Sequence, residues 1–239
     1  MKTVKENGQL AVVAKRQLAK LGTDQKNNIL AVCAKALRDN AEFIVGENAK
    51  DMENAKNNNM PQGLQDRLML NVDRVNAMAE GLELIEKLPD PIGEVLDMRT
   101  LPNGLTVGQK RVPMGVIGII YEARPNVTSD AFGLCLKAGS AVILRGGSDA
   151  IHSNIATVSV FRKAIEDLGY NPDFVQLVED TTRASSTEMM TLNDYIDLLI
   201  PRGGKGLIQS VVKNATVPVI ETGVGNCHIY MDESGKIDD

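Results

Sequence analysis

A carboxylate stands beside a glycine-rich turn in the segment Val219-Ile220-Glu221-Thr222-Gly223-Val224-Gly225-Asn226-Cys227-His228-Ile229-Tyr230. Because glycine lacks a Cβ atom, backbone at this Gly-x-Gly turn can approach a ligand closely. Cys227 is a thiol inside the motif, and His228 follows it. Neighbouring residues on a strand point to opposite faces, so His228 is poorly placed to act as a base for Cys227. The segment therefore predicts a carboxylate, Glu221, held next to a bound ligand.

A second group of reactive side chains lies in Tyr121-Glu122-Ala123-Arg124-Pro125-Asn126, directly after an apolar run. Ligands of open α/β sheets bind at the carboxyl ends of strands, so this position favours a functional role. Asn126 is either the N-cap of the next helix or a donor to an oxyanion. Arg124 is either a ligand for an acyl phosphate or incoming phosphate, or one partner of a surface salt bridge.

Two basic, glycine-rich loops also follow strand-like runs. The first contains Arg145, Gly146, Gly147 and Ser148, and the second contains Pro201, Arg202, Gly203, Gly204, Lys205 and Gly206. A cation, glycines and a serine N-cap suit an anion at a helix N-terminus, and the second loop fits backbone approach to a pyrophosphate. The second loop has neither the Gly-x-Gly-x-x-Gly nor the Walker spacing, and a tight glycine turn is its alternative interpretation; Arg-Gly-Gly alone is a weak motif.

The elements that must position these groups change character along the chain. Residues 3–88 show helical spacing of apolar side chains, with Thr23-Asp24 as a predicted N-cap and breaks near residues 54–63 and 88–93. Residues 98–107 predict a hairpin around Asn103-Gly104, a pair that primed turns favour. This hairpin is either a plain surface feature or part of an oligomerisation surface.

From residue 112 onward, continuous apolar runs alternate with helical patterns. The runs are 116–120, 141–144, 174–178, 195–200 and 217–220, and the longest helical patterns are 127–137 and 149–168. Continuous apolar strands between amphipathic helices predict a parallel sheet covered on both faces. The expected fold class is therefore α/β, with N-terminal helices before a doubly wound sheet.

Composition excludes several classes of function. The chain has 239 residues, a formal net charge of −5 and no Trp, which gives no reason to expect nucleic acid or an anionic membrane as a partner. No apolar run reaches membrane-spanning length, and the first residues lack the apolar core of a signal peptide. Three widely spaced cysteines predict no metal site and fit a reducing compartment, so we expect a cytoplasmic protein.

Two motifs in the sequence resemble those of a known family. Glu221 to His228 and Glu122 to Asn126 are similar to segments of the aldehyde dehydrogenase superfamily, in its γ-glutamyl phosphate reductase branch. The resemblance implies an aldehyde-dehydrogenase-like fold: residues 1–96 as the N-terminal helical section of the cofactor domain, 97–112 as the hairpin of an oligomerisation flap, and 113–239 as a Rossmann-like NADP-binding domain. In this family the catalytic cysteine lies well downstream of Glu221, so we expect an incomplete copy without the catalytic domain.

The same resemblance implies a reaction and roles for named residues. The reaction is NADPH-dependent reduction of L-glutamyl 5-phosphate to L-glutamate 5-semialdehyde and phosphate in proline biosynthesis, through a cysteine thioester that hydride reduces. Asn126 is implied to donate to the oxyanion, and Arg145 replaces the superfamily's lysine, which favours NADP over NAD because a guanidinium forks onto a 2′-phosphate. Thr222 and Gly223 are implied to pass close to the nicotinamide. Glu221 is implied to belong to the site, where it contacts the cofactor or takes part in proton transfer. It is not expected to act as the base that activates water for thioester hydrolysis.

Partners and alternatives follow from the same reasoning. We expect a homo-oligomer when the protein is full length, and a functional link to glutamate 5-kinase. One alternative is a non-catalytic NADP-binding or assembly module. Another is a general or CoA-acylating aldehyde dehydrogenase, against which the Glu122 to Asn126 loop argues. Isolated strand edges also predict instability or aggregation of the chain alone.

Overall fold

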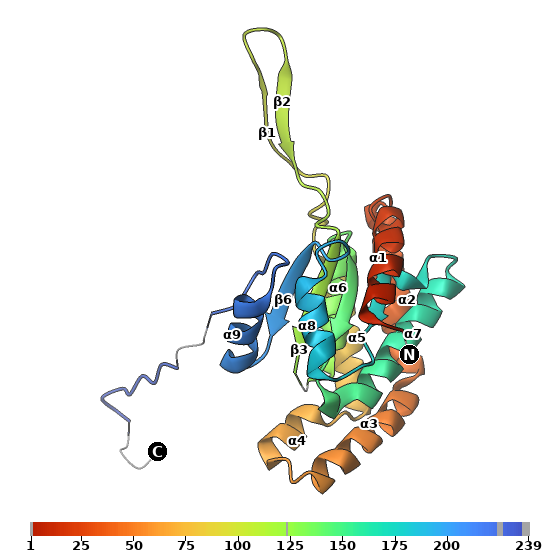
Figure 1. Ribbon diagram of the computed structural model, residues 1–239, viewed down its shortest axis with the longest axis vertical. Helices are drawn as coiled ribbons and strands as arrows, with labels where there is room; N and C mark the ends of the chain where they lie inside the picture. The colour runs from red at the N-terminus through yellow and green to blue at the C-terminus, as the bar shows by residue number, and fades with distance from the viewer. Residues whose placement is uncertain (1, 123, 224–226, 236–239) are drawn as a thin grey trace.

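A four-stranded parallel sheet in the order β5-β4-β3-β6 forms the centre of the fold (Figure 1). The computed structural model describes residues 2–122, 124–223 and 227–235. Strands β3 (Val116–Tyr121) and β4 (Ala141–Arg145) are buried along their whole length, and β5 (Val175–Leu177) and β6 (Leu198–Arg202) flank them. The predicted α/β fold with a doubly wound parallel sheet is confirmed.

Side chains of β3 alternate between the two faces of the sheet. Ile117, Ile119 and Tyr121 join the larger hydrophobic core, whereas Val116 and Ile120 join the smaller one. This is the period of two expected of a strand. Helices α6 (Asn126–Lys137) and α7 (Ile151–Asp167) cover the first face. Helices α1 (Val4–Leu18), α8 (Arg183–Thr191) and α9 (Lys205–Asn214) cover the second. Two short 3₁₀ turns, η1 (Ser148–Ala150) and η2 (Pro172–Phe174), come before and after α7.

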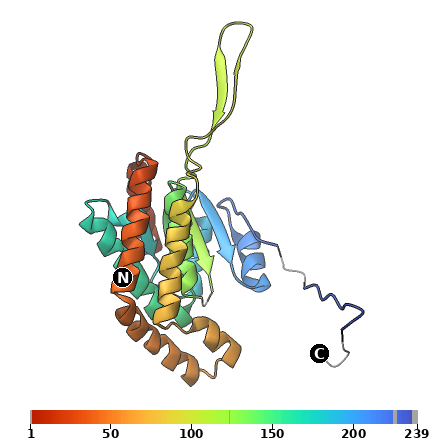
Figure 2. The ribbon, with the colours of Figure 1, turned by 180° about the vertical axis from the view of Figure 1, so that it is seen from behind.

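The predicted N-terminal helical section is present and packs on α6 and α7 (Figure 2). It continues after α1 with α2 (Thr23–Asp39), α3 (Ala41–Asn57), α4 (Gln62–Leu68) and α5 (Val72–Lys87). The predicted N-cap at Thr23 is wrong, because Gly22 is the N-cap and Thr23 is already helical. The Thr23 hydroxyl instead donates to Asp90 at 2.8 Å, a partner 67 residues away. Among the described helices, none is both long and apolar enough to cross a bilayer.

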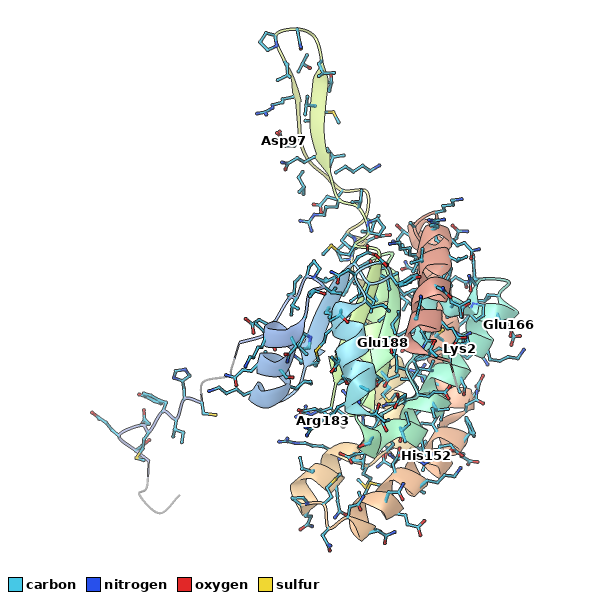
Figure 3. All side chains as sticks on the ribbon, in the orientation of Figure 1. Lys2, Asp97, His152, Glu166, Arg183 and Glu188 are labelled. Carbon is cyan, nitrogen blue, oxygen red and sulfur yellow. The ribbon has the colours of Figure 1, made fainter. Side chains whose placement is uncertain are left out.

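A two-stranded antiparallel hairpin projects from the domain at the amino end of β3 (Figures 1 and 3). Its strands are β1 (Val95–Thr100) and β2 (Thr106–Lys110), and every residue of both is exposed. The turn differs from the predicted primed type. Gly104 N–H donates to the Leu101 carbonyl at 2.9 Å, so Pro102 and Asn103 are the central residues, and only Gly104 has a positive φ. Proline fixes φ near −65°, which selects a type I turn followed by a left-handed glycine.

The strand predicted for residues 217–220 is reduced to one bridge, between Leu199 and Val219. Leu199 N–H donates to the Pro218 carbonyl at 2.8 Å, and Ile220 N–H donates back to Leu199 at 3.0 Å. Pro218 has no N–H group, so a longer ladder cannot form through it. Further along, Ile229 and Tyr230 are 93% and 88% exposed.

A buried ion pair joins α2 to the base of the hairpin. Lys26 Nζ lies 2.5 Å from Asp90 Oδ2 and donates to the Lys137 carbonyl at 3.0 Å; the side chains of Lys26 and Asp90 are 1% and 9% exposed. Burial raises the pKa of Asp90, but hydrogen bonds from Lys26, Ile92 and Thr23 outweigh it, so the pKa lies below its ordinary value. The pair therefore fixes where the helical section meets the hairpin.

Replacing Asp90 by Asn should lower the free energy of unfolding at pH 7 by about 3 kcal/mol, because the buried Lys26 ammonium loses its counter-ion. The folded pKa of Asp90 lies below the ordinary 3.8, so the ionised pair stabilises the fold above pH 3.8 and this contribution is lost as pH falls through the folded value. Urea unfolding followed by circular dichroism should show the two proteins converging below pH 3.8. Asp39→Asn, which removes an exposed pair with Lys35, is the control and should change stability by less than about 0.5 kcal/mol. An equal effect of both substitutions would contradict the role of burial.

Candidate functional site

The register of the sheet brings the predicted loops to one edge. Ile120 of β3 pairs with Arg145 of β4, and Tyr121 pairs with Arg202 of β6. All three strands therefore end at the same level. The chain moves outward from β3 through β4 to β5 and then returns to the other side of β3, so the strand order reverses there. Open α/β sheets bind ligands at this switch point, outside the carboxyl ends of the strands.

Two of the predicted loops touch each other through a residue that the sequence did not single out. Glu122 Oε2 accepts a hydrogen bond from Gly204 N–H at 3.0 Å. A Cβ atom on Gly203 would lie 2.7 Å from Glu122 Cδ, so the absence of a side chain there permits the contact. Gly204 is also the N-cap of α9, and Arg202 and Lys205 on either side of the glycines are exposed. The loops after β3 and β6 thus meet at one backbone amide, with two exposed cations beside it.

Asn126 lies at the start of α6, with its side chain exposed. The N-cap is Pro125, so the interpretation of Asn126 as an N-cap is wrong. Asn126 Nδ2 donates to Asp130 Oδ2 at 3.2 Å, one turn along the helix. An amide nitrogen carries two hydrogens, so this bond orients the group and leaves one hydrogen for a ligand oxygen. Burial raises the pKa of Asp130, against the hydrogen bond from Asn126 and the charge of Arg202.

Arg145 points into the protein at the end of β4. Its Nη2 donates to the carbonyls of Thr181 and Thr182 at 2.6 and 2.9 Å, and Nε has no partner among the described residues. Burial lowers the pKa of Arg145, and the charge of Asp180 opposes that shift. In this structure the guanidinium holds the loop after β5, and its contact with a 2′-phosphate stays a prediction.

The amide groups at the start of α7 are occupied by a buried carboxylate from α3. Asp51 accepts hydrogen bonds from the N–H groups of His152 and Ser153 at 3.1 and 2.8 Å, and from Ser153 Oγ at 2.6 Å. Figure 3 shows His152 at the end of the domain near α3. Burial raises the pKa of Asp51, and the bonds from Ser153 and His152 limit that shift. The predicted serine N-cap at Ser148 is wrong, because Gly147 caps η1 and no side chain caps it.

Gly146 is required by the polar groups packed behind it. A Cβ atom there would lie 2.2 Å from Asn154 Nδ2 and 3.2 Å from Tyr121 Oη. The buried Tyr121 hydroxyl lies 2.7 Å from Thr128 Oγ1, which donates to Asn154 Oδ1 at 2.8 Å. This chain of hydrogen bonds joins β3, α6 and α7, and it fixes the loop after β4 from behind.

The glycine motif after residue 220 lies only partly within the described chain. Glu221, Thr222, Gly223, Cys227 and His228 are exposed, and residues 224–226 of the motif lie outside the described residues. The roles predicted for Glu221, Thr222 and Gly223 therefore stay predictions.

The other two cysteines, Cys33 and Cys135, are buried. Burial raises the pKa of Cys135 to about 12 and raises that of Cys33 further, so neither thiol ionises at neutral pH. Since the thiolate is the nucleophilic form, both are structural. No group of three or more His, Cys, Asp or Glu side chains within the described residues could hold a metal ion.

A cavity of about 460 Å³ lies beside Asn126, between α4, α5 and the start of α6. Its lining includes Arg124 and Asn126, which the sequence predicted, and Arg67, Arg74 and Asp130, which it missed. A larger cavity of about 580 Å³ lies between α1, α7 and β5, and none of the predicted site residues lines it. Of the predicted site residues, Arg124 and Asn126 therefore line the smaller cavity, and the others lie outside it.

Comparison with known proteins identifies relatives that match this arrangement. A model of the aldehyde dehydrogenase family matches residues 1–236. The γ-glutamyl phosphate reductase of Lachnospira eligens is 56% identical over 238 residues, which is 100% of this chain and 57% of that protein. The reductase of Heliobacterium modesticaldum is 57% identical over 231 residues, or 97% of this chain and 55% of that protein. The chain thus spans little more than half the length of these relatives.

Solved structures give the same result. A γ-glutamyl phosphate reductase from Thermotoga maritima superposes with a TM-score of 0.93 and 43% identity, over 98% of this chain and 56% of that one. The Saccharomyces cerevisiae reductase gives a TM-score of 0.83 with 28% identity, over 92% and 56%. The predicted resemblance to this branch is confirmed over the whole chain.

The substitution Gly146→Ala should lower the free energy of unfolding by about 1–3 kcal/mol, because the added methyl group must displace the buried Asn154 amide. Gly206→Ala in α9 is the control: nothing lies within 4 Å of the position that its methyl group would take, so it should raise helix stability by up to about 1 kcal/mol. Thermal unfolding of both variants measures the difference. Unchanged stability of Gly146→Ala would show that the hydrogen-bonded side chains behind the loop move aside at little cost.

Proposed function

The chain belongs to the aldehyde dehydrogenase family, and we propose that the protein is an NADPH-dependent reductase of L-glutamyl 5-phosphate in proline biosynthesis. The products are L-glutamate 5-semialdehyde and phosphate. The observation that carries this proposal is the contact between the loop bearing Arg124 and Asn126 and the glycine loop before α9, at the switch point of the sheet. Relatives that are 53–57% identical and named as γ-glutamyl phosphate reductases support the substrate.

The residues where the loops after β3 and β6 meet fit a dinucleotide. Gly204 N–H already donates to a carboxylate oxygen, and the exposed Arg202 and Lys205 beside it suit a pyrophosphate at the N-terminus of α9. When bound, the cofactor supplies the hydride. The preference for NADP(H) rests on Arg145, and the further proposed cofactor contacts are Gly146, Gly147, Ser148, Pro201, Gly203, Thr222 and Gly223, with Glu221 beside them.

Asn126 and Arg124 carry complementary roles in this proposal. Asp130 holds the Asn126 amide, so that its second hydrogen is fixed in direction before a substrate arrives. Donors oriented in advance stabilise the oxyanion that develops during acyl transfer. Arg124 lines the same cavity, and its side chain makes no hydrogen bond or ion pair with a described residue. A guanidinium in that position suits the phosphate that leaves or enters.

Assembly is also part of the proposal. The hairpin exposes apolar side chains, including Val95, Leu96 and Met98, on strands with unpaired outer edges. We assign it to an oligomerisation flap, with residues 1–96 and 113–239 forming the cofactor domain. The names of the relatives do not favour the alternative of a non-catalytic module.

Catalysis can be tested in a chimera in which this chain replaces the matching segment of the Lachnospira eligens reductase. With NADP⁺, L-glutamate 5-semialdehyde and phosphate, the chimera should form NADPH only when phosphate is present. Asn126→Ala should lower kcat by about 10²–10³-fold, as for loss of one oxyanion donor. Activity that requires coenzyme A instead of phosphate would contradict the proposal that the substrate is an acyl phosphate.

Cys227→Ala should leave the turnover of the same chimera unchanged, because the family places the nucleophile elsewhere. The isolated chain should show no turnover with or without this substitution. Phosphate-dependent turnover by the isolated chain that Cys227→Ala abolishes would make Cys227 the nucleophile.

Arg124→Gln should raise the KM for phosphate about tenfold in the chimera, equivalent to loss of one charge-assisted hydrogen bond of about 1.4 kcal/mol. Arg16→Gln is the matched control, since Arg16 is an exposed arginine in the last turn of α1. An unchanged KM for phosphate would show that Arg124 is a surface residue that does not bind phosphate.

A further inference from the structure

The cavity beside Asn126 is lined by three arginines, more than one phosphate group requires, and by the two carboxylates Asp66 and Asp130. Three guanidinium groups line it: Arg67 at the end of α4, Arg74 in the first turn of α5, and Arg124 before α6. A volume of about 460 Å³ falls within the range of small-molecule sites. Arg124 and Asn126 are already assigned to the reacting end of a substrate, so the other arginines face what extends away from it.

Arg74 is bonded to its own loop through both terminal nitrogens. Its Nη1 donates to the carbonyls of Asp66 and Met69, and its Nη2 lies 2.9 Å from Asp66 Oδ1. These bonds close the turn between α4 and α5 and neutralise the charge of Arg74. They also fix the backbone of Asp66, the residue before Arg67. Arg74 therefore acts as a positioning residue for the C-terminal end of α4.

Arg67 is the arginine that this loop presents to the cavity. It is exposed, and its guanidinium makes no hydrogen bond or ion pair with any residue that the structure describes. An unpaired guanidinium on a fixed helix end matches the two oxygens of a carboxylate in a forked arrangement. The apolar part of the cavity lining includes Met69, Leu70 and Met78, which suit the methylene groups of a short chain.

We propose that this cavity binds the amino-acid end of the substrate and that Arg67 pairs with its α-carboxylate. The inference rests on the proposed function, since it takes the reacting end to lie at Asn126. It makes Arg67 a specificity-determining residue: an acyl phosphate or aldehyde without a carboxylate at its far end loses this contact. Arg124 and Arg67 would then hold the two anionic ends of one dianionic chain.

The test is calorimetric titration of the chimera, in which the rest of the reductase is present, with three probes: 2-amino-5-phosphonopentanoate, pentylphosphonate and inorganic phosphate. The first carries a phosphonate and an α-amino acid, and the second lacks the amino-acid end. We expect Arg67→Gln to weaken binding of 2-amino-5-phosphonopentanoate about tenfold and to leave pentylphosphonate unchanged. Arg67→Lys should recover part of the loss, and Arg124→Gln should weaken both phosphonates.

Arg16→Gln is the control for loss of an exposed arginine from a last helical turn, and in the chimera it should bind all probes as the unsubstituted chimera does. Unchanged thermal unfolding of Arg67→Gln excludes misfolding, because the side chain is exposed. Equal weakening of both phosphonates by Arg67→Gln, or no weakening, overturns the inference while the proposed function stands. Failure of every phosphonate to bind, with Arg124 intact, overturns the site itself and the proposed function with it.

Discussion

The parallel register of β3 between β4 and β6 is the constraint on which the candidate site depends. Gly118 in the middle of β3 shows how closely the strands and their cover are packed, since a Cβ atom there would lie 2.6 Å from Leu199 Cδ2. A one-residue slip would send every side chain of β3 to the opposite face. With the register fixed, Glu122 follows β3 at the level where Gly203 and Gly204 follow β6. The approach of these loops is thus a consequence of core packing.

Buried polar groups set the geometry around this edge, while the groups proposed for chemistry stay exposed. Asp51 and the Tyr121–Thr128–Asn154 chain lie in the interior, each tied to backbone or side chains from other elements. A buried polar group that loses its partner costs about 1–3 kcal/mol, which makes these contacts strongly position-specific. Arg67, Arg124 and Asn126 avoid that cost because they remain in water until a ligand arrives. Rigid support and accessible donors are therefore supplied by different residues.

Local pattern was enough to predict the helical section, the central strands and the edge where loops meet, because helical and strand periodicity reflect burial of neighbouring side chains. Local pattern failed to predict hydrogen bonds whose two partners are distant in sequence. Asp51 caps α7 from 102 residues away, and Thr23 bonds Asp90 rather than its own helix. Arg67, on the short helix α4, and Arg74, in the first turn of α5, carried no signal either, because a single arginine on a helix is typical of a solvated surface. Only the three-dimensional cavity assigns them to the site.

Two helix N-termini were candidates for phosphate, and energetics separates them. At α7 the amides are bonded to the buried Asp51, and removing a buried carboxylate from its donors costs several kcal/mol. At α9 the Gly204 amide is bonded to Glu122, whose side chain is exposed, and exposed charge contacts contribute only about 0–1 kcal/mol. A phosphate can therefore displace Glu122 at little cost but cannot displace Asp51. Of the two helix N-termini, that of α9 is therefore the one that remains available to a phosphate.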